Sequence, residues 1–194
     1  SKYDWQYIFI GFLLISVFIF TDLIKVFDKK ILYFVPKLIN DQPYRIFTSI
    51  LVHADLNHLL SNIGGIIITR YFLINLGIQS KFFFINFILI CSFLNFLIIW
   101  VYEKILSYFF DILPNYASLG FSGIIYALLG FLLLSSFYGK SYFLGKKIGL
   151  KYNYQSHKMS KIICLVGLIF SLLPGISLLG HLSGFISGCF LFLI

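Results

Sequence analysis

The chain has 194 residues, of which 60% are hydrophobic and only 11% are charged, and its mean hydropathy is +0.96. Soluble domains average about 25% charged residues, so this chain has too few charges to cover a folded surface in water. The excess apolar surface must face lipid, which indicates a polytopic membrane protein. A net charge of +8 would favour nucleic-acid binding in a soluble protein. In a membrane protein basic residues lie in loops and set orientation, so we expect no nucleic-acid partner.

Six apolar runs follow one another along the chain, each close to the roughly 20 residues that cross a bilayer as a helix. They fall at about residues 5–21, 57–76, 82–101, 118–138, 159–173 and 179–194. A mixed loop containing Lys29 and Arg45 follows the first run, and a lysine-rich stretch follows the fourth. We therefore predict an all-α fold, a bundle of six transmembrane helices that forms a single domain over residues 1–194.

Basic residues are unevenly divided between the two ends of such a bundle. Nine lie at the N-terminus and in the loops after the second and fourth helices: Lys2, Arg70, Lys81, Lys140, Lys146, Lys147, Lys151, Lys158 and Lys161. Six lie in the other loops: Lys25, Lys29, Lys30, Lys37, Arg45 and Lys104. The lysine-rich fourth loop decides the bias, which predicts that both termini are cytoplasmic. A composition rich in Lys, Phe and Ile indicates an AT-rich genome, so we expect a prokaryotic plasma membrane.

Polar residues of three separate runs fall at one depth in this arrangement. His58 and Asn62 begin the second helix, Ser122 lies about a turn into the fourth, and His181 begins the sixth. A polar side chain inside a membrane span is costly and faces the protein interior or a water-filled pocket. The grouping therefore indicates a site near the outer leaflet. Each residue also has a structural interpretation, as a hydrogen bond between helices.

The residue types at this depth suit acyl transfer. A serine hydroxyl is a poor nucleophile until a base takes its proton, and His181 can be that base for Ser122. His58 and Asn62, spaced i and i+4, share one helix face and can both donate to an oxyanion. Since no carboxylate lies at this depth, we predict a Ser–His dyad. Tyr126, one turn after Ser122, either stacks on the imidazole or is simply a core aromatic.

Small residues favour close contact between the fourth and sixth helices. The glycines concerned are Gly120, Gly123, Gly184 and Gly188. Gly184 and Gly188 form a small-xxx-small pair, which lets helix backbones approach closely. Close contact would bring His181 within reach of Ser122.

Three segments in order resemble the rhomboid family of intramembrane serine proteases. "GFSG" at residues 120–123 fits the family's G-x-S-G, and "HLSGFISG" at 181–188 fits its H-x-x-G-x-x-x-G. "HADLNHLLSN" at 53–62 supplies the family's two histidines and asparagine, at His53, His58 and Asn62. "PYRIFTSILVH" is similar to the family's first-loop segment, with Arg45 matching and Tyr44 replacing the usual tryptophan.

The resemblance implies an endopeptidase that cleaves transmembrane segments of membrane proteins near the outer leaflet through an acyl-enzyme. Ser122 would be the nucleophile and His181 the base, while His58, Asn62 and the Ser122 N–H would stabilise the oxyanion. No metal or organic cofactor is implied; the partners are transmembrane substrates and the lipid bilayer. The Pro174–Gly175 pair would end the fifth helix and supply a hinge.

Two other functions remain open. A rhomboid-like pseudoprotease would bind transmembrane clients without cutting them, although such proteins usually lack the serine or the histidine that this chain keeps. A small transporter would need polar groups across the whole membrane thickness. The third and fifth runs offer only Asn86, Asn95 and scattered serines.

Overall fold

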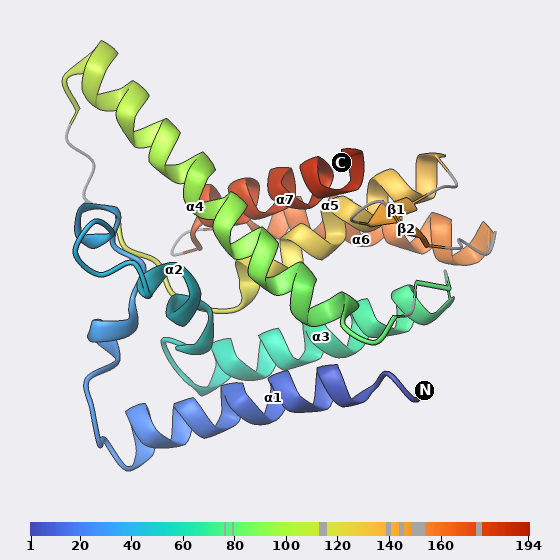
Figure 1. Ribbon diagram of the computed structural model, residues 1–194, viewed down its shortest axis with the longest axis horizontal. Coiled ribbons are helices and arrows are strands. Elements are labelled where there is room, and N and C mark those ends of the chain that lie inside the picture. Colours follow the sequence, from blue (N-terminus) through green and yellow to red (C-terminus); the bar gives the residue numbers. More distant parts are fainter. Residues whose placement is uncertain are drawn as a thin grey trace.

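The computed structural model describes residues 1–75, 77–78, 80–112, 116–138, 141–143, 146–148, 154–173 and 176–194. Six of its helices have 14 or more residues and follow the predicted order along the chain (Figure 1). They are α1 (Trp5–Phe18), α3 (Leu56–Asn75), α4 (Phe83–Phe110), α5 (Ser122–Tyr138), α6 (Tyr154–Phe170) and α7 (Leu178–Leu193). The predicted hinge at Pro174–Gly175 lies outside the described residues.

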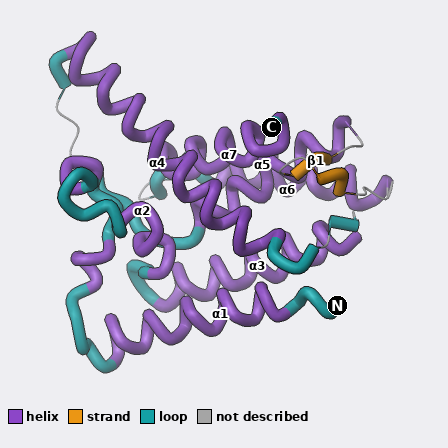
Figure 2. Tube along the Cα trace, viewed as in Figure 1, coloured by secondary structure: helices purple, strands orange, loops and turns teal. Residues whose placement is uncertain are grey.

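The connections contain more structure than the sequence indicates. After α1 come a π-helix (Ile19–Leu23), 3₁₀ turns (Lys29–Leu32, Pro36–Leu38 and Ser49–Leu51) and the short α2 (Arg45–Thr48). In the lysine-rich connection, β1 (Ser141–Phe143) pairs antiparallel with β2 (Lys146–Ile148), the orange strands of Figure 2. The regular elements of the described residues are all helices apart from this short hairpin, so the predicted all-α fold class holds and the hairpin is an addition to it.

The third long helix extends well beyond its predicted end at residue 101. α4 has 28 residues, about 42 Å at the usual rise per residue. The charged residues Glu103 and Lys104 do not interrupt it, and it ends where Asp111 adopts a left-handed backbone with φ 52°. Its last turns project beyond the other helices (Figure 1).

α5 begins at Ser122, four residues later than the predicted run, because the preceding segment is extended. Ser118 exchanges two backbone hydrogen bonds with Phe34, of 2.9 and 3.0 Å. Gly120 then turns the chain with φ +104° and donates its N–H to the Ser49 carbonyl at 2.9 Å. Ser122 is therefore the first helical residue and not one turn inside the helix.

By length and composition, two helical segments of the described chain could each cross a membrane: Trp5–Leu23 and Phe83–Phe110. The apolar helices Ser122–Tyr138 and Leu178–Leu193 are shorter. The predicted count of six spans is therefore not established by helix length and composition alone.

The distribution of side chains is that of a protein surrounded by lipid. Large apolar side chains point outward, with Ile8 and Phe12 each 70% exposed. Polar side chains, in contrast, are buried among the helices, including His53, Asn62 and His181. Such an arrangement buries polar groups where they find partners and leaves apolar groups for hydrocarbon.

The two ends of the helix bundle carry different connections of the chain. The Gln6 side chain donates to the Ser80 carbonyl at 3.0 Å and accepts the Phe84 N–H at 2.9 Å, which ties the start of α1 to the α3–α4 turn. Both chain ends and the hairpin lie toward this end, and the connection between α1 and α3 lies at the other (Figure 1).

Candidate active site

A cavity of about 50 Å³ opens between the starts of α5 and α7, the middle of α4 and the α1–α3 connection. Ser122 and His181 both line it, together with Ser49, Asn95 and Gly120. A space of this size admits water, because one molecule needs only about 10–15 Å³ of such volume. The site therefore offers a pocket large enough to hold water between the helices.

α5 and α7 bring Ser122 and His181 to this cavity by unusually close packing. A Cβ atom added to Gly184 would overlap the Gly123 carbonyl, and one added to Gly188 would overlap the Ala127 carbonyl. The close helix contact expected from these glycines is thus present. The Ser122 hydroxyl makes no hydrogen bond to any other described residue, and the hydrogen bonds of catalytic groups are often long or poorly aligned before a substrate binds.

His181 is held on two sides. Its ring stacks on Tyr126 with centroids 4.0 Å apart and planes 14° apart. Its Nδ1 atom lies 2.7 Å from the hydroxyl of Ser171, in the turn that follows α6. Our sequence reasoning did not single out Ser171. The only signal available was its place near the predicted outer end of the fifth run, at the depth of His181.

His58 and Asn62 face the turn that leads into Ser122. A Cβ atom on Gly120 would lie 2.8 Å from His58 Nε2 and 3.7 Å from Asn62 Nδ2. Asn62 Nδ2 is buried and has no hydrogen-bond partner among the described residues. Gly120 therefore makes room for these two side chains, which corrects the expectation that it thins a helix for packing.

The tautomer of His58 follows from its backbone contact. The Ala54 N–H donates to His58 Nδ1 at 3.3 Å. In neutral histidine only one ring nitrogen carries a proton, so an accepting Nδ1 places it on Nε2. His58 therefore presents an N–H donor beside the Gly120 turn.

His53 contacts the same turn through a hydrogen bond to its backbone. It is fully buried, and its Nε2 accepts the Phe121 N–H at 3.3 Å. Its ring meets that of His58 edge to face, with centroids 5.0 Å apart. Burial lowers the pKa of His53 to about 4, so the ring is neutral at pH 7 and can accept this bond.

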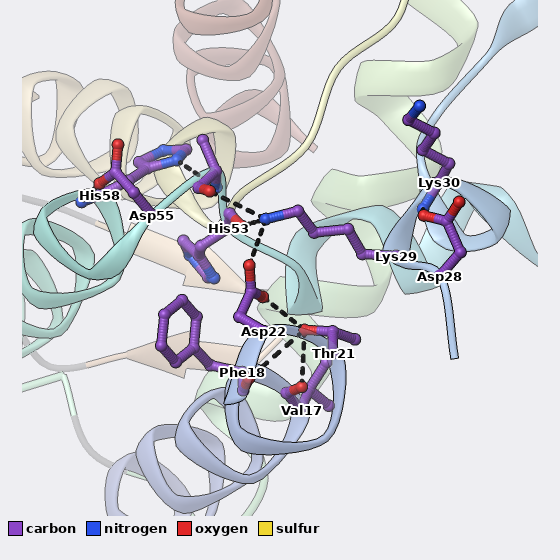
Figure 3. Close-up of polar contacts among 11 residues, drawn as sticks. Val17, Phe18, Thr21, Asp22, Asp28, Lys29, Lys30, His53, Asp55 and His58 are labelled. Atoms are coloured by element: carbon purple, nitrogen blue, oxygen red, sulfur yellow. Dashed lines mark hydrogen bonds and ion pairs between the residues drawn. The ribbon is translucent and has the colours of Figure 1, made fainter. Parts of the chain in front are cut away.

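Lys29 links the end of α1 to the segment that precedes α3 (Figure 3). Its ammonium pairs with the Asp22 carboxylate at 2.5 Å and donates to the carbonyls of His53 and Ala54 at 2.9 and 2.8 Å. The His53 carbonyl and the Ala54 N–H belong to one peptide group. Lys29 therefore polarises the amide that donates to His58. The sequence identified Lys29 only as one of the basic residues in the first loop.

Arg45, singled out by the resemblance, is a brace of the first connection. It is buried, and its guanidinium donates to the Gln42 side chain and to the carbonyls of Lys30 and Tyr33, at 2.6, 2.9 and 2.7 Å. It does not line the cavity.

No group of three or more His, Cys, Asp or Glu side chains within the described parts of the chain is arranged to hold a metal ion. The side chains that line the cavity offer the His181 imidazole, the Ser122 hydroxyl with those of other serines, and the Asn95 amide. His58 and Asn62 do not line the cavity itself; they lie against its Gly120 wall.

Comparison with known proteins identifies the family of the chain. A family model for the Rhomboid domain matches residues 40–194, which covers α3 to α7. The chain therefore belongs to the rhomboid family, and it is an integral membrane protein. Most members of this family are intramembrane serine proteases, and inactive members also exist. A search of curated proteins finds no match.

Proposed function

We propose that this protein is an intramembrane serine endopeptidase that cleaves transmembrane segments of other membrane proteins. One observation carries the proposal. The buried Nδ2 of Asn62, which has no hydrogen-bond partner in the described part of the chain, lies with His58 Nε2 beside the turn that leads into Ser122. A buried donor without a partner costs free energy of folding, so a donor of this kind beside a serine favours the binding of an acceptor. A substrate oxyanion is an acceptor that would complete this site.

The proposed reaction has two halves. Ser122 Oγ attacks the substrate carbonyl carbon and its proton passes to His181 Nε2; the intermediate then collapses as His181 protonates the leaving amine. Water from the cavity attacks the acyl-enzyme, gives a proton to His181, and Ser122 is released with its proton restored. His58, Asn62 and the Ser122 N–H donate to the oxyanion in both halves. One such donor is worth roughly 3–4 kcal/mol in serine proteases.

The same proposal places the protein in its membrane. Residues 1–194 form one domain with six spans, both termini are cytoplasmic, and the site lies near the outer leaflet of a prokaryotic plasma membrane. The outward apolar side chains and the lysine-rich fourth connection support this arrangement. α1, which precedes the matched region, belongs to the same unit because Ile10, Leu14 and Phe18 share the main hydrophobic core.

A fluorophosphonate probe tests whether Ser122 is activated. We expect the purified wild-type protein to be labelled and Ser122→Ala and His181→Ala to remain unlabelled. Asn62→Ala should lower the rate of cleavage of a transmembrane substrate in liposomes by roughly 100-fold, the usual loss for one oxyanion donor. Ser136→Ala is the matched control, since that α5 hydroxyl bonds to the Leu133 carbonyl of its own helix, at 2.7 Å.

If a folded wild-type protein is not labelled and does not cleave the substrate, the proposal is contradicted. That result would favour a client-binding pseudoprotease. Movement of solute across the same liposomes without cleavage would instead indicate a transporter.

A further inference from the structure

A series of hydrogen bonds connects the Nδ1 atom of His181 to the backbone of α6. His181 Nδ1 lies 2.7 Å from Ser171 Oγ, which lies 2.9 Å from the Tyr126 hydroxyl. The Tyr126 hydroxyl in turn donates to the Gly167 carbonyl at 2.6 Å. Ser171 is only 1% exposed, so no solvent competes for its hydroxyl.

The chain ends in a group that can only accept, which gives it a direction. The Gly167 carbonyl takes the hydrogen of Tyr126. The hydrogen of Ser171 then has two acceptors, the Tyr126 oxygen and the Gly167 carbonyl at 3.0 Å. With the Ser171 hydrogen directed to these acceptors, the lone pairs of Ser171 face His181, and Nδ1 then supplies the hydrogen between them.

We propose that Ser171 is a positioning residue that holds His181 in its Nδ1–H tautomer, with Nε2 free to take the proton of Ser122. The inference rests on the proposed roles of Ser122 and His181. A free imidazole favours the proton on Nε2, where it could not act as a base toward the serine. In soluble serine proteases a buried aspartate sets the tautomer. A hydroxyl does so without placing a charge among apolar helices.

Proton balance requires nothing more. When Ser122 gives its proton to Nε2, the imidazolium keeps its Nδ1–H, which still donates to Ser171. Ser171 gains and loses no proton. The contrast with His58 supports the argument, since there Nδ1 accepts the Ala54 N–H and Nε2 becomes the donor.

Variants of the chain of residues 1–194 test this role. Ser171→Ala removes the acceptor and leaves no added bulk, while Ser171→Thr retains a hydroxyl. Ser160→Ala is the matched control, because Ser160 lies on α6, is also 1% exposed and bonds to the His157 carbonyl at 2.9 Å. Two readouts are used: ¹⁵N spectra of histidine-labelled protein, with His181 assigned by its loss in His181→Ala, and kcat and KM for a transmembrane substrate.

We expect His181 to carry its proton on Nδ1 in the wild type and on Nε2 in Ser171→Ala. kcat should fall roughly 10- to 100-fold in that variant, less than the roughly 10²–10⁴-fold that general-base catalysis contributes in full, with KM changed less than about twofold. Ser171→Thr should restore both readouts, and Ser160→Ala should change neither.

An unchanged tautomer or an unchanged kcat in Ser171→Ala would overturn the role of Ser171, as would an equal loss of kcat in Ser160→Ala. A wild-type protein that neither labels nor cleaves would overturn the proposed protease function. The spectra would then decide the role of Ser171 independently of activity.

Discussion

At the scale of single residues, the chemistry of the site depends on which ring nitrogen of each histidine makes a hydrogen bond, and to which group. His58 accepts there from a backbone N–H and becomes a donor at Nε2. His181 faces the hydroxyl of Ser171 and, in our proposal, becomes an acceptor at Nε2. His53 is neutral because it is buried, and it accepts the Phe121 N–H beside Ser122. Three identical side chains thus differ in function through their neighbours.

Lys29→Met should show that the segment holding His58 is fixed from outside the site. Loss of the ammonium leaves Asp22 unpaired and frees the carbonyls of His53 and Ala54. We expect the free energy of unfolding to fall by about 1–3 kcal/mol, typical for hydrogen bonds to a charged group, and probe labelling of Ser122 to slow. Thermal unfolding in detergent and the labelling rate measure both effects.

Lys30→Met is the control for charge, since Lys30 is adjacent and exposed and its side chain points away from the cluster (Figure 3). It should change stability by less than about 0.5 kcal/mol. An equal effect of the two substitutions would contradict a specific role for Lys29.

At the scale of helices, the site depends on how closely α5 and α7 approach. Gly184 and Gly188 lie directly against backbone carbonyls of α5, so the two helix axes are separated by little more than main chain. Stacking of Tyr126 on His181 follows from this approach, because the two rings come from these two helices. The main core is filled by aromatic rings, with Phe87 and Phe131 centroids 5.6 Å apart.

Gly188→Ala should therefore separate the helices even though it adds only one methyl group. The new Cβ would overlap the Ala127 carbonyl, which is backbone and has little freedom to move. We expect a loss of roughly 1–3 kcal/mol in stability, as for other overpacked sites, together with slower labelling of Ser122.

Gly64→Ala is the matched control on α3, since nothing lies within 4 Å of a Cβ atom added there. Alanine is favoured over glycine in a helix by about 1 kcal/mol, so this variant should be neutral or more stable. Destabilisation of both variants alike would show that the effect reflects glycine loss in general.

At the scale of the whole molecule, the two ends of the bundle have different roles. The catalytic candidates lie at the end that carries the α1–α3 connection, and the chain ends and hairpin lie toward the other (Figure 1). Buried polar groups occur inside a shell of exposed apolar side chains. In the membrane placement that we propose, water would reach the site from one side while lipid surrounds the apolar shell.

Single cysteines, introduced after the three native cysteines are replaced by alanine, test the orientation. Asp41→Cys lies at the site end and Lys81→Cys at the opposite end, and both native residues are exposed. A membrane-impermeant maleimide should label Asp41→Cys in intact cells and Lys81→Cys only after permeabilisation. The reverse pattern would contradict the orientation that the lysines predict.

Much of the fold could be predicted from the sequence because its signals are local. Apolar runs of membrane-spanning length located all six long helices, and the order of Ser122, His181, His58 and Asn62 in three short motifs indicated the family. The C-terminal end of α4 and the N-terminal start of α5 could not be predicted in this way. α5 starts late because Ser118 pairs with Phe34, a residue more than 80 positions earlier.

The amino-acid sequence alone determined the membrane class of this protein, its helix order and the types of side chain available for chemistry, since composition and spacing are properties of the chain itself. Only the tertiary structure decided that Gly120 makes room for His58, that Lys29 holds the segment before α3, and that Ser171 contacts His181. These contacts join residues from different elements. Packing sets their geometry, and no local pattern in the sequence records it.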